Sequence, residues 1–296
     1  MPCMTQSSSN RSLTLPLIAA AMAGLGCAQT SPLELSVTLR KPSFVIGEPV
    51  NLELRLRNKS GTSVNSREME AVTGTVRYVI RTPRGGEERY VTAMSKEPRE
   101  LLIIPPGGQV AADELILYNF GTRKLAFPTP GRYTIRCEYL EFSAIGVSPA
   151  PATVAIDVVA DPAEIEGSIL FSRQDVASVV AYGKRDATAL NALADFAGSH
   201  PDSRLTPYAI YALALVRAMR IDHTKPDYAG AREMLQQVLK PGFSLLPQAL
   251  IKSASLSLSL GLVEDARKDM NRLIQQFPET ASAQTARQLT TRLEKQ

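Results

Sequence analysis

Histidine is scarce in this sequence, and tryptophan is missing altogether. The 296 residues include two histidines, His200 and His223, and neither belongs to a metal-ligand spacing such as H-E-x-x-H. No C-x-x-C pair occurs. The glycine pairs in "PRGGEER" and "PPGGQV" lack the lysine and following helix of a phosphate-binding loop, so hairpin turns explain them better. We therefore expect no metal, no cofactor and no catalytic residues, and predict that the protein is not an enzyme.

Cysteine is too sparse for an internal disulfide. Of the three cysteines, Cys3 and Cys27 lie in or beside the N-terminal leader described below, which leaves Cys137 alone in the folded part. In "YTIRCEY" this residue shares one side of a strand with Tyr133 and Ile135, so we expect a packed core thiol. The folded protein must therefore rely on its hydrophobic cores.

Concentrated positive charge is also absent. The net charge is +4, but the 33 basic residues are dispersed among 29 acidic ones with no basic run of five or more. Nucleic-acid binding needs a concentrated basic footprint, so no nucleic-acid partner is expected.

The N-terminus has the pattern of a secretory signal. Arg11 precedes the apolar stretch 13–26, which is too short to span a bilayer comfortably and is followed by small residues. We predict export, with residues 1–28 as the signal peptide. Two processing routes stay open: cleavage after Ala28, or lipidation of Cys27, which follows "GLG" as in bacterial lipoproteins. The expected location is periplasmic, secreted or envelope-anchored, with membrane association only through a lipid on Cys27.

In residues 31–160, hydrophobic residues tend to recur at every second position, which is the period of β-strands. In "VNLELRLR", Val50, Leu52, Leu54 and Leu56 alternate with Asn51, Glu53, Arg55 and Arg57, which predicts a strand with one buried and one wet face. Similar short runs follow in "TVRYVI", "ERYVTAM", "ELLIIP", "ELILYNF", "GRYTIRCEYLEF" and "ATVAIDVV". Because turn signals separate these runs, we predict an antiparallel β-sandwich.

Two short motifs in this region resemble the immunoglobulin-like modules of bacterial envelope and secreted proteins. They are "GEPV" leading into a strand and "PGRY" starting another. The resemblance implies that Gly131 closes a turn and that Tyr133 begins the penultimate strand, where such folds often keep a tyrosine corner. The antibody hallmarks are missing, since the chain has no tryptophan and no cysteine to face Cys137. Such modules serve as adhesive domains, inhibitors or spacers.

After residues 161–167, which we predict to be a linker, the period changes to that of helices over residues 168–296. The carboxylates Glu164 and Glu166 fall in this linker, and we expect both to be solvated. Helices are expected to begin near Leu205, to cover 227–239, and to continue through two more amphipathic stretches.

The helical region repeats a fixed spacing between a proline and an alanine. The segments "HPDSRLTPYA", "KPGFSLLPQA" and "FPETASAQTA" each place an alanine eight residues after a proline. A proline stops one helix, and a small alanine lets the next helix approach its neighbour closely. "AREML" at Ala231 is matched thirty-five residues later by "ARKDM" at Ala266. This pattern predicts stacked helical hairpins.

These residues resemble the tetratricopeptide repeat family, especially its extended form in bacterial envelope proteins, where a "YPDS" type turn precedes each hairpin. In the second unit Ala254, Ala266, Met270 and Pro278 match the family pattern, whereas the first unit departs from it at "IDHTKPD". The resemblance implies an array with a concave groove that binds peptides or proteins. The implied groove residues lie on the first helix of each pair: Tyr208, Tyr211, Arg217, Gln248 and Lys252. The alternative is that they are only the solvated side of amphipathic helices.

Taken together, the patterns predict a multidomain all-β plus all-α chain, in which an immunoglobulin-like sandwich precedes a tetratricopeptide-like array. We predict an exported scaffold of the cell envelope that binds a partner protein or peptide through its helical repeats. The alternative is an inhibitor or adhesin that binds through sandwich loops, of which residues 58–74 form the longest, with the helices as an anchoring or dimerisation base.

Overall fold

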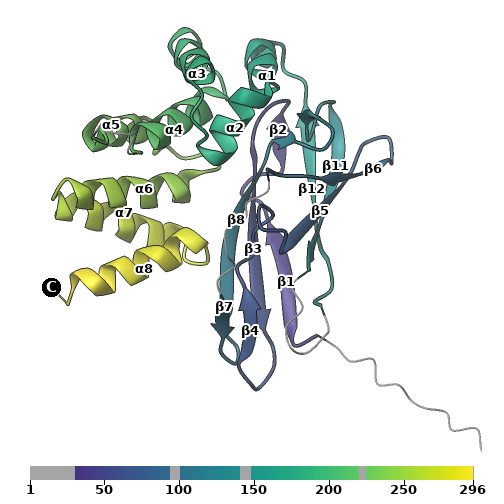
Figure 1. Cartoon of the computed structure of the whole chain (residues 1–296), viewed down its shortest axis with the longest axis vertical. Coiled ribbons are helices and arrows are strands. Elements are labelled where there is room, and N and C mark those ends of the chain that lie inside the picture. Colours follow the sequence, from purple (N-terminus) through teal and green to yellow (C-terminus); the bar gives the residue numbers. More distant parts are fainter. Residues whose placement is uncertain (1–30, 94–100, 141–147, 220–224, 296) are drawn as a thin grey trace, which may run out of the picture.

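The computed structural model describes residues 31–93, 101–140, 148–219 and 225–295, and shows a β-rich half followed by a helical half (Figure 1). The predicted signal peptide and Cys27 lie outside the described residues. In the described part of the chain, no helix is both long enough and apolar enough to cross a bilayer. The predicted order, a β region before an α region, is confirmed.

The strands form two larger sheets and two short pairs. The three-stranded sheet has the order β1-β3-β8 and contains β1 (Leu33–Thr38), β3 (Val50–Asn58) and β8 (Gln109–Ile116). The five-stranded sheet has the order β2-β12-β11-β5-β6 and contains β2 (Ser43–Val45), β12 (Ala152–Val159), β11 (Gly131–Tyr139), β5 (Val76–Arg81) and β6 (Glu87–Tyr90). The short pairs are β4 (Val64–Arg67) with β7 (Leu101–Ile104), and β9 (Tyr118–Asn119) with β10 (Lys124–Leu125).

One hydrophobic core joins the two larger sheets. Alternate residues of β3 share a buried cluster with residues of β5 and β11, and its members include Leu52, Leu54, Leu56, Tyr78, Ile80, Ile135 and Cys137. Each fully buried leucine contributes about 1.5–3 kcal/mol relative to an exposed one. Burial raises the pKa of the Cys137 thiol to about 12, so this cysteine is a packed core thiol, as predicted.

The strand pairing differs from the prediction at one place. Among the described strands, β2 runs parallel to β12, whereas the other pairs are antiparallel. After β1, the chain leaves the three-stranded sheet and lays β2 along the edge of the five-stranded one. Tyr133 donates its hydroxyl to the Thr129 carbonyl at 2.9 Å, which is the geometry of a tyrosine corner. The immunoglobulin-like assignment itself stays a prediction.

The helical half is a series of hairpins in which consecutive helices pack against each other. Its helices are α1 (Ile165–Phe171), α2 (Gln174–Tyr182), α3 (Ala187–Ser199), α4 (Thr206–Arg217), α5 (Tyr228–Val238), α6 (Leu246–Ser259), α7 (Val263–Gln276) and α8 (Ala281–Leu293). Pro207 and Pro247 stand in the first turns of α4 and α6, where a missing backbone N–H costs nothing.

The repeated alanines occupy equivalent buried positions. Ala209, Ala249 and Ala286 each have an exposed fraction of 0 %. Each lies in the first half of α4, α6 or α8, where the helix meets its neighbours. This burial confirms that the repeated small residue serves close helix packing.

The segment 161–167, which the sequence predicts to be a linker, is structured along most of its length. A short 3-10 helix, η1 (Pro162–Glu164), leads directly into α1 at Ile165. Glu164 is only 5 % exposed, so the expected solvation of this carboxylate is wrong. Its carboxylate binds Ser203 and the Arg204 backbone N–H, so the segment packs against the first repeated turn of the helical half.

The outer face of the three-stranded sheet is covered around Asn51 and Glu53 instead of being solvated throughout. Asn51 is 3 % exposed and Glu53 is 8 % exposed, although their alternation along β3 predicts solvation. The reason is that the helical half lies over this face. Tyr211 of α4 and Gln248 of α6 line one cavity with Asn51, and α8 approaches β8 (Figure 1).

Candidate functional site at the junction of the two halves

A tight turn of the β-rich half rests on the first helix of the array. Gly47 in this turn has φ of +83°, and a Cβ added there would lie 2.9 Å from the backbone Cα of Ser168 on α1. The Ser168 hydroxyl donates a hydrogen bond to the Ile46 carbonyl at 2.6 Å. Glycine is therefore required here both by its backbone conformation and by the close approach of α1.

We expect Gly47→Ala to destabilise the chain more than Gly85→Ala. Both glycines have a positive φ, +83° and +87°, so both substitutions carry the left-handed backbone cost of about 1–2 kcal/mol. Only Gly47 faces another element, because nothing lies within 4 Å of a Cβ added at Gly85. Urea unfolding should show an additional loss of about 1–3 kcal/mol for Gly47→Ala from overpacking. Equal losses would contradict a tight junction.

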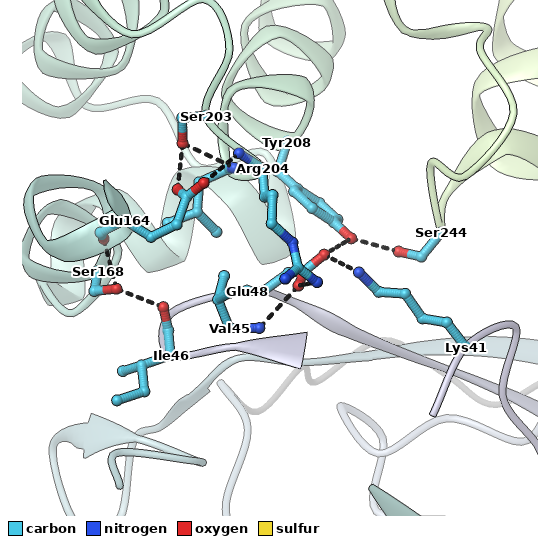
Figure 2. Close-up of polar contacts among 11 residues, drawn as sticks. Lys41, Val45, Ile46, Glu48, Glu164, Ser168, Ser203, Arg204, Tyr208 and Ser244 are labelled. Carbon is cyan, nitrogen blue, oxygen red and sulfur yellow. Dashed lines mark hydrogen bonds and ion pairs between the residues drawn. The ribbon is translucent and has the colours of Figure 1, made fainter. Parts of the chain in front are cut away.

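Glu48, the next residue, is the centre of the polar contacts at this junction (Figure 2). Its carboxylate is 2 % exposed and accepts hydrogen bonds from the Val45 backbone N–H at 3.0 Å and the Tyr208 hydroxyl at 2.9 Å. Lys41 and Arg204 both form ion pairs with it, the latter at 3.4 Å. Two cations and two neutral donors thus compensate one buried carboxylate, which satisfies the demand for partners that burial imposes.

Each of the two repeated turns supplies a serine to the polar contacts, Ser203 in the first and Ser244 in the second, although the two serines do not occupy equivalent positions of the repeat. Since Tyr208 donates to Glu48, Ser244 of the second turn is the donor in its 2.7 Å hydrogen bond to the Tyr208 oxygen. Ser203 of the first turn donates to Glu164, whose carboxylate also accepts the Arg204 backbone N–H at 2.7 Å. Ser244 thus supports the Tyr208 hydroxyl that binds Glu48, whereas Ser203 binds Glu164 within the helical half.

A cleft of about 610 Å³ adjoins the Glu48 cluster. The two repeated turns and the start of α4 form its walls, with Lys41, Arg204, Tyr208, Lys240 and Phe243 among the lining residues. The rings of Tyr208 and Phe243 meet edge to face, with centroids 5.1 Å apart. Burial, followed by the charge of Glu48, raises the pKa of Tyr208, so its hydroxyl stays protonated as a donor.

The charges of this cleft are unequal. Three lining side chains, those of Lys41, Arg204 and Lys240, are cationic, whereas Glu48 is the one acidic residue among the described residues that line it. Glu48 is enclosed by its donors, whereas the Arg204 side chain is 41 % exposed and Lys240 is also exposed to solvent. The cleft is therefore suited to an anionic group beside apolar surface.

The structure separates the five groove residues implied by the resemblance. Tyr208 and Tyr211 are 2 % and 7 % exposed, so they do not line an open groove. Tyr208 belongs to the Glu48 cluster, and Tyr211 and Gln248 face the outer side of the three-stranded sheet. Arg217 is exposed and donates to Asp227 at 2.7 Å. Lys252 is exposed on α6, away from the cleft.

Sequence reasoning missed Glu48 and Glu164. Glu48 stands in the "GEPV" turn, and Glu164 stands in the segment predicted to be a linker. Acidic residues in turns are normally solvated, and their partners here are 160 and 39 residues away along the chain. The available signal was Gly47 beside Glu48, since a glycine in a turn can mark close approach of another backbone.

His200, the histidine within the described residues, makes contacts with an aromatic ring and a carboxylate. His200 stacks on Phe196, with ring centroids 4.9 Å apart, and its Nε2 lies 3.0 Å from Glu166. His223 lies outside the described residues. Within the described ranges, no group of three or more histidine, cysteine, aspartate and glutamate side chains is arranged to hold a metal ion.

Comparison with known families identifies one repeat. Residues 248–280, which include most of α6 and all of α7, match the family model named "Tetratricopeptide repeat". This match supports a tetratricopeptide-like helical region at the second predicted unit. No curated protein matches the chain.

Solved structures resemble parts of the chain at low identity. An alkylpurine DNA glycosylase of Pseudomonas fluorescens is 13 % identical with a TM-score of 0.28, over 43 % of this chain and 30 % of its own. A β-glucosidase of Erythrobacter marinus is 14 % identical with a TM-score of 0.28, over 43 % of this chain and 15 % of its own. The CARDB domain of a Pyrococcus furiosus protein is 13 % identical with a TM-score of 0.25, over 43 % of this chain and 87 % of its own. The chain thus spans under one third of the two enzymes.

Proposed function

We propose that this protein is an exported scaffold of the bacterial cell envelope that binds a partner protein through its helical array, without catalysis or a cofactor. The observation that carries the proposal is the tetratricopeptide repeat match at residues 248–280, next to the cleft between two successive repeat turns. Arrays of this kind generally present extended surfaces to peptides and proteins.

The covered inner face of the array directs the proposal to the cleft. The three-stranded sheet lies against Tyr211 and Gln248, so a partner has better access to the cleft edged by Arg204 and Lys240. The cationic rim favours a carboxylate of the partner, and the accessible apolar residues of the lining, Pro201, Ile210 and Pro241, favour an adjoining apolar side chain. The Glu48 cluster would hold this cleft in one shape, which reduces the entropy lost on binding.

The test is capture from detergent-solubilised envelope with the full chain as bait, followed by affinity measurement on the retained protein. Lys240→Glu should weaken binding by about tenfold or more, because a charge-assisted contact becomes a repulsion. Lys268→Glu is the matched control, since Lys268 is exposed on α7 and does not line the cleft. Equal retention by both variants would refute the cleft as the binding site.

Binding through the β-rich half is the second candidate, and a separate observation favours it. Leu101 and Ile103 on β7 are each 70 % exposed, and β7 pairs with β4 inside the 58–74 segment. An exposed apolar strand can accept a strand or side chains from a partner. If the double variant Leu101→Ser, Ile103→Ser abolishes capture while Lys240→Glu retains it, this candidate replaces the first. We test this candidate by substitution and not by deletion of residues 58–74, because Val64 and Met69 in that segment are buried in the core.

A further inference from the structure

A second cavity, which we name the sheet–array cavity, lies between the outer face of the three-stranded sheet and the helices. Its volume is about 260 Å³, several times the roughly 30 Å³ that one molecule occupies in liquid water. Asn51 of β3 and Asp113 of β8 line it from the sheet, and Tyr211 and Gln248 line it from α4 and α6. Both halves of the chain therefore build this site.

Polar atoms in the sheet–array cavity lack protein partners. Asn51 is 3 % exposed, and its Nδ2 has no hydrogen-bond partner among the described residues. The same holds for Asp113 Oδ1 and for both Oε1 and Nε2 of Gln248. Buried polar atoms are nearly always hydrogen-bonded, because an unpaired one costs its full desolvation penalty. Two of these atoms, Asp113 Oδ1 and Gln248 Oε1, are acceptors that indicate a donor ligand, whereas the amide N–H groups of Asn51 and Gln248 act on the carboxylate of Asp113.

The cavity carries negative charge. Asp113 is the only charged residue among the described residues that line it. Burial and the charge of Glu53 raise the pKa of Asp113 to about 6, while Arg40 and the amides of Asn51 and Gln248 lower it. Arg40 forms an ion pair with Glu53, which limits its effect on Asp113. Asp113 is thus mostly ionised at neutral pH and lacks a cation of its own.

The remaining walls are largely aliphatic and include Leu115, Leu215 and Leu245. A carboxylate and an amide oxygen at one side, with aliphatic walls around them, fit a cation carried on an apolar chain. We propose that the sheet–array cavity binds a protonated primary amine on an unbranched aliphatic chain, with the ammonium between Asp113 Oδ1 and Gln248 Oε1. A lysine side chain of a protein and a small free alkylamine share this chemistry. The sheet–array cavity is separate from the cleft, so amine binding there does not depend on the proposed function of the cleft.

Titration of the full chain, followed by NMR, tests the proposal with three probes. They are n-pentylammonium, Nα-acetyl-lysine methylamide and the uncharged Nα-acetyl-norleucine methylamide. Asp113→Asn removes the charge and nearly preserves the side-chain shape. Asp157→Asn, at an exposed position of β12, is the matched control for the loss of one carboxylate. If Asp113→Asn does not fold, Gln248→Leu removes both unpartnered amide atoms and serves as the second variant.

We expect saturable binding of at least one amine, with the norleucine probe and Asp113→Asn each weaker by about tenfold or more. Asp157→Asn should bind as the unaltered chain does. Binding of n-pentylammonium alone would assign the cavity to free amines, and binding of the blocked lysine as well would assign it to protein side chains. Equal affinity for norleucine, unchanged affinity in Asp113→Asn or Gln248→Leu, or no binding would overturn the proposal and leave water as the occupant.

Discussion

Replacing Glu48 by alanine is expected to destabilise the chain by about 3–5 kcal/mol, the cost of removing one partner of a buried ion pair. The substitution leaves Lys41, Arg204 and the Tyr208 hydroxyl without their shared acceptor at the junction. Urea unfolding followed by circular dichroism measures this loss. We also expect proteolysis between the two halves to become faster, because the Val45–Pro49 turn loses its anchor.

The matched control is Glu34→Ala. Glu34 also pairs with a lysine, Lys59 at 2.6 Å, but its side chain is 48 % exposed. Surface pairs of this kind contribute about 0–1 kcal/mol. A double-mutant cycle of Glu48→Ala with Tyr208→Phe should show a coupling of about 0.5–3 kcal/mol, since the two side chains share a hydrogen bond. A loss for Glu48→Ala no larger than for Glu34→Ala would contradict the central role of this carboxylate.

Glu114 is expected to give the chain an unusual dependence on pH. It lies opposite Leu52 in the β3–β8 pairing and accepts a hydrogen bond from the Ala71 backbone N–H at 2.7 Å. Burial raises the pKa of this carboxyl from 4.5 to about 8. Between these values the folded chain keeps a proton that the unfolded chain has lost. Stability should therefore fall as pH rises from about 4.5 to about 8, by up to about 1.4 kcal/mol per pH unit, and then level off.

The variant Glu114→Gln separates this effect from other titrations. A glutamine keeps the acceptor for Ala71 but cannot ionise, so it should be close to the unaltered chain at pH 5 and more stable at pH 8. Asp113, with a pKa raised from 3.8 to about 6, acts in the same direction at lower pH, and Asp113→Asn isolates that contribution. Unfolding free energies from urea titrations at pH 5, 6, 7 and 8 measure the slopes. A profile of Glu114→Gln parallel to that of the unaltered chain would rule out Glu114 as the cause.

The sequence anticipates the candidate site only in part. The repeated turns and their alanines were visible as a spacing, and the match to a tetratricopeptide repeat supports the second unit. Tyr208 was singled out for its place on a first helix, but its partner Glu48 was not. The physical reason is that a carboxylate in a turn has no local pattern that distinguishes burial from solvation.

The sheet–array cavity was hidden for the same reason. Asn51 and Glu53 alternate with leucines along β3, which is the pattern of a strand with a wet face. Whether water or a helix covers that face depends on how the helical array packs against the sheet. The alternation of residues within β3 is the same in both cases. Asp113 and Gln248 belong to the same category, because each acquires its environment from the other half of the chain.

By itself, the sequence determined the order of a β region and an α region, most of the strands, the helices from α4 to α7 and the repeated turns. These features follow from hydrophobic residues that recur every two residues in strands and every three to four residues in helices, and from the positions of proline and glycine. All of these signals act between residues that are close along the chain. Only the tertiary structure decided which polar faces are covered, that Glu48 is a buried acceptor, and where the two cavities lie. Those properties depend on contacts such as Glu48 to Tyr208, whose members are 160 residues apart, and such contacts exist only once both halves have packed together.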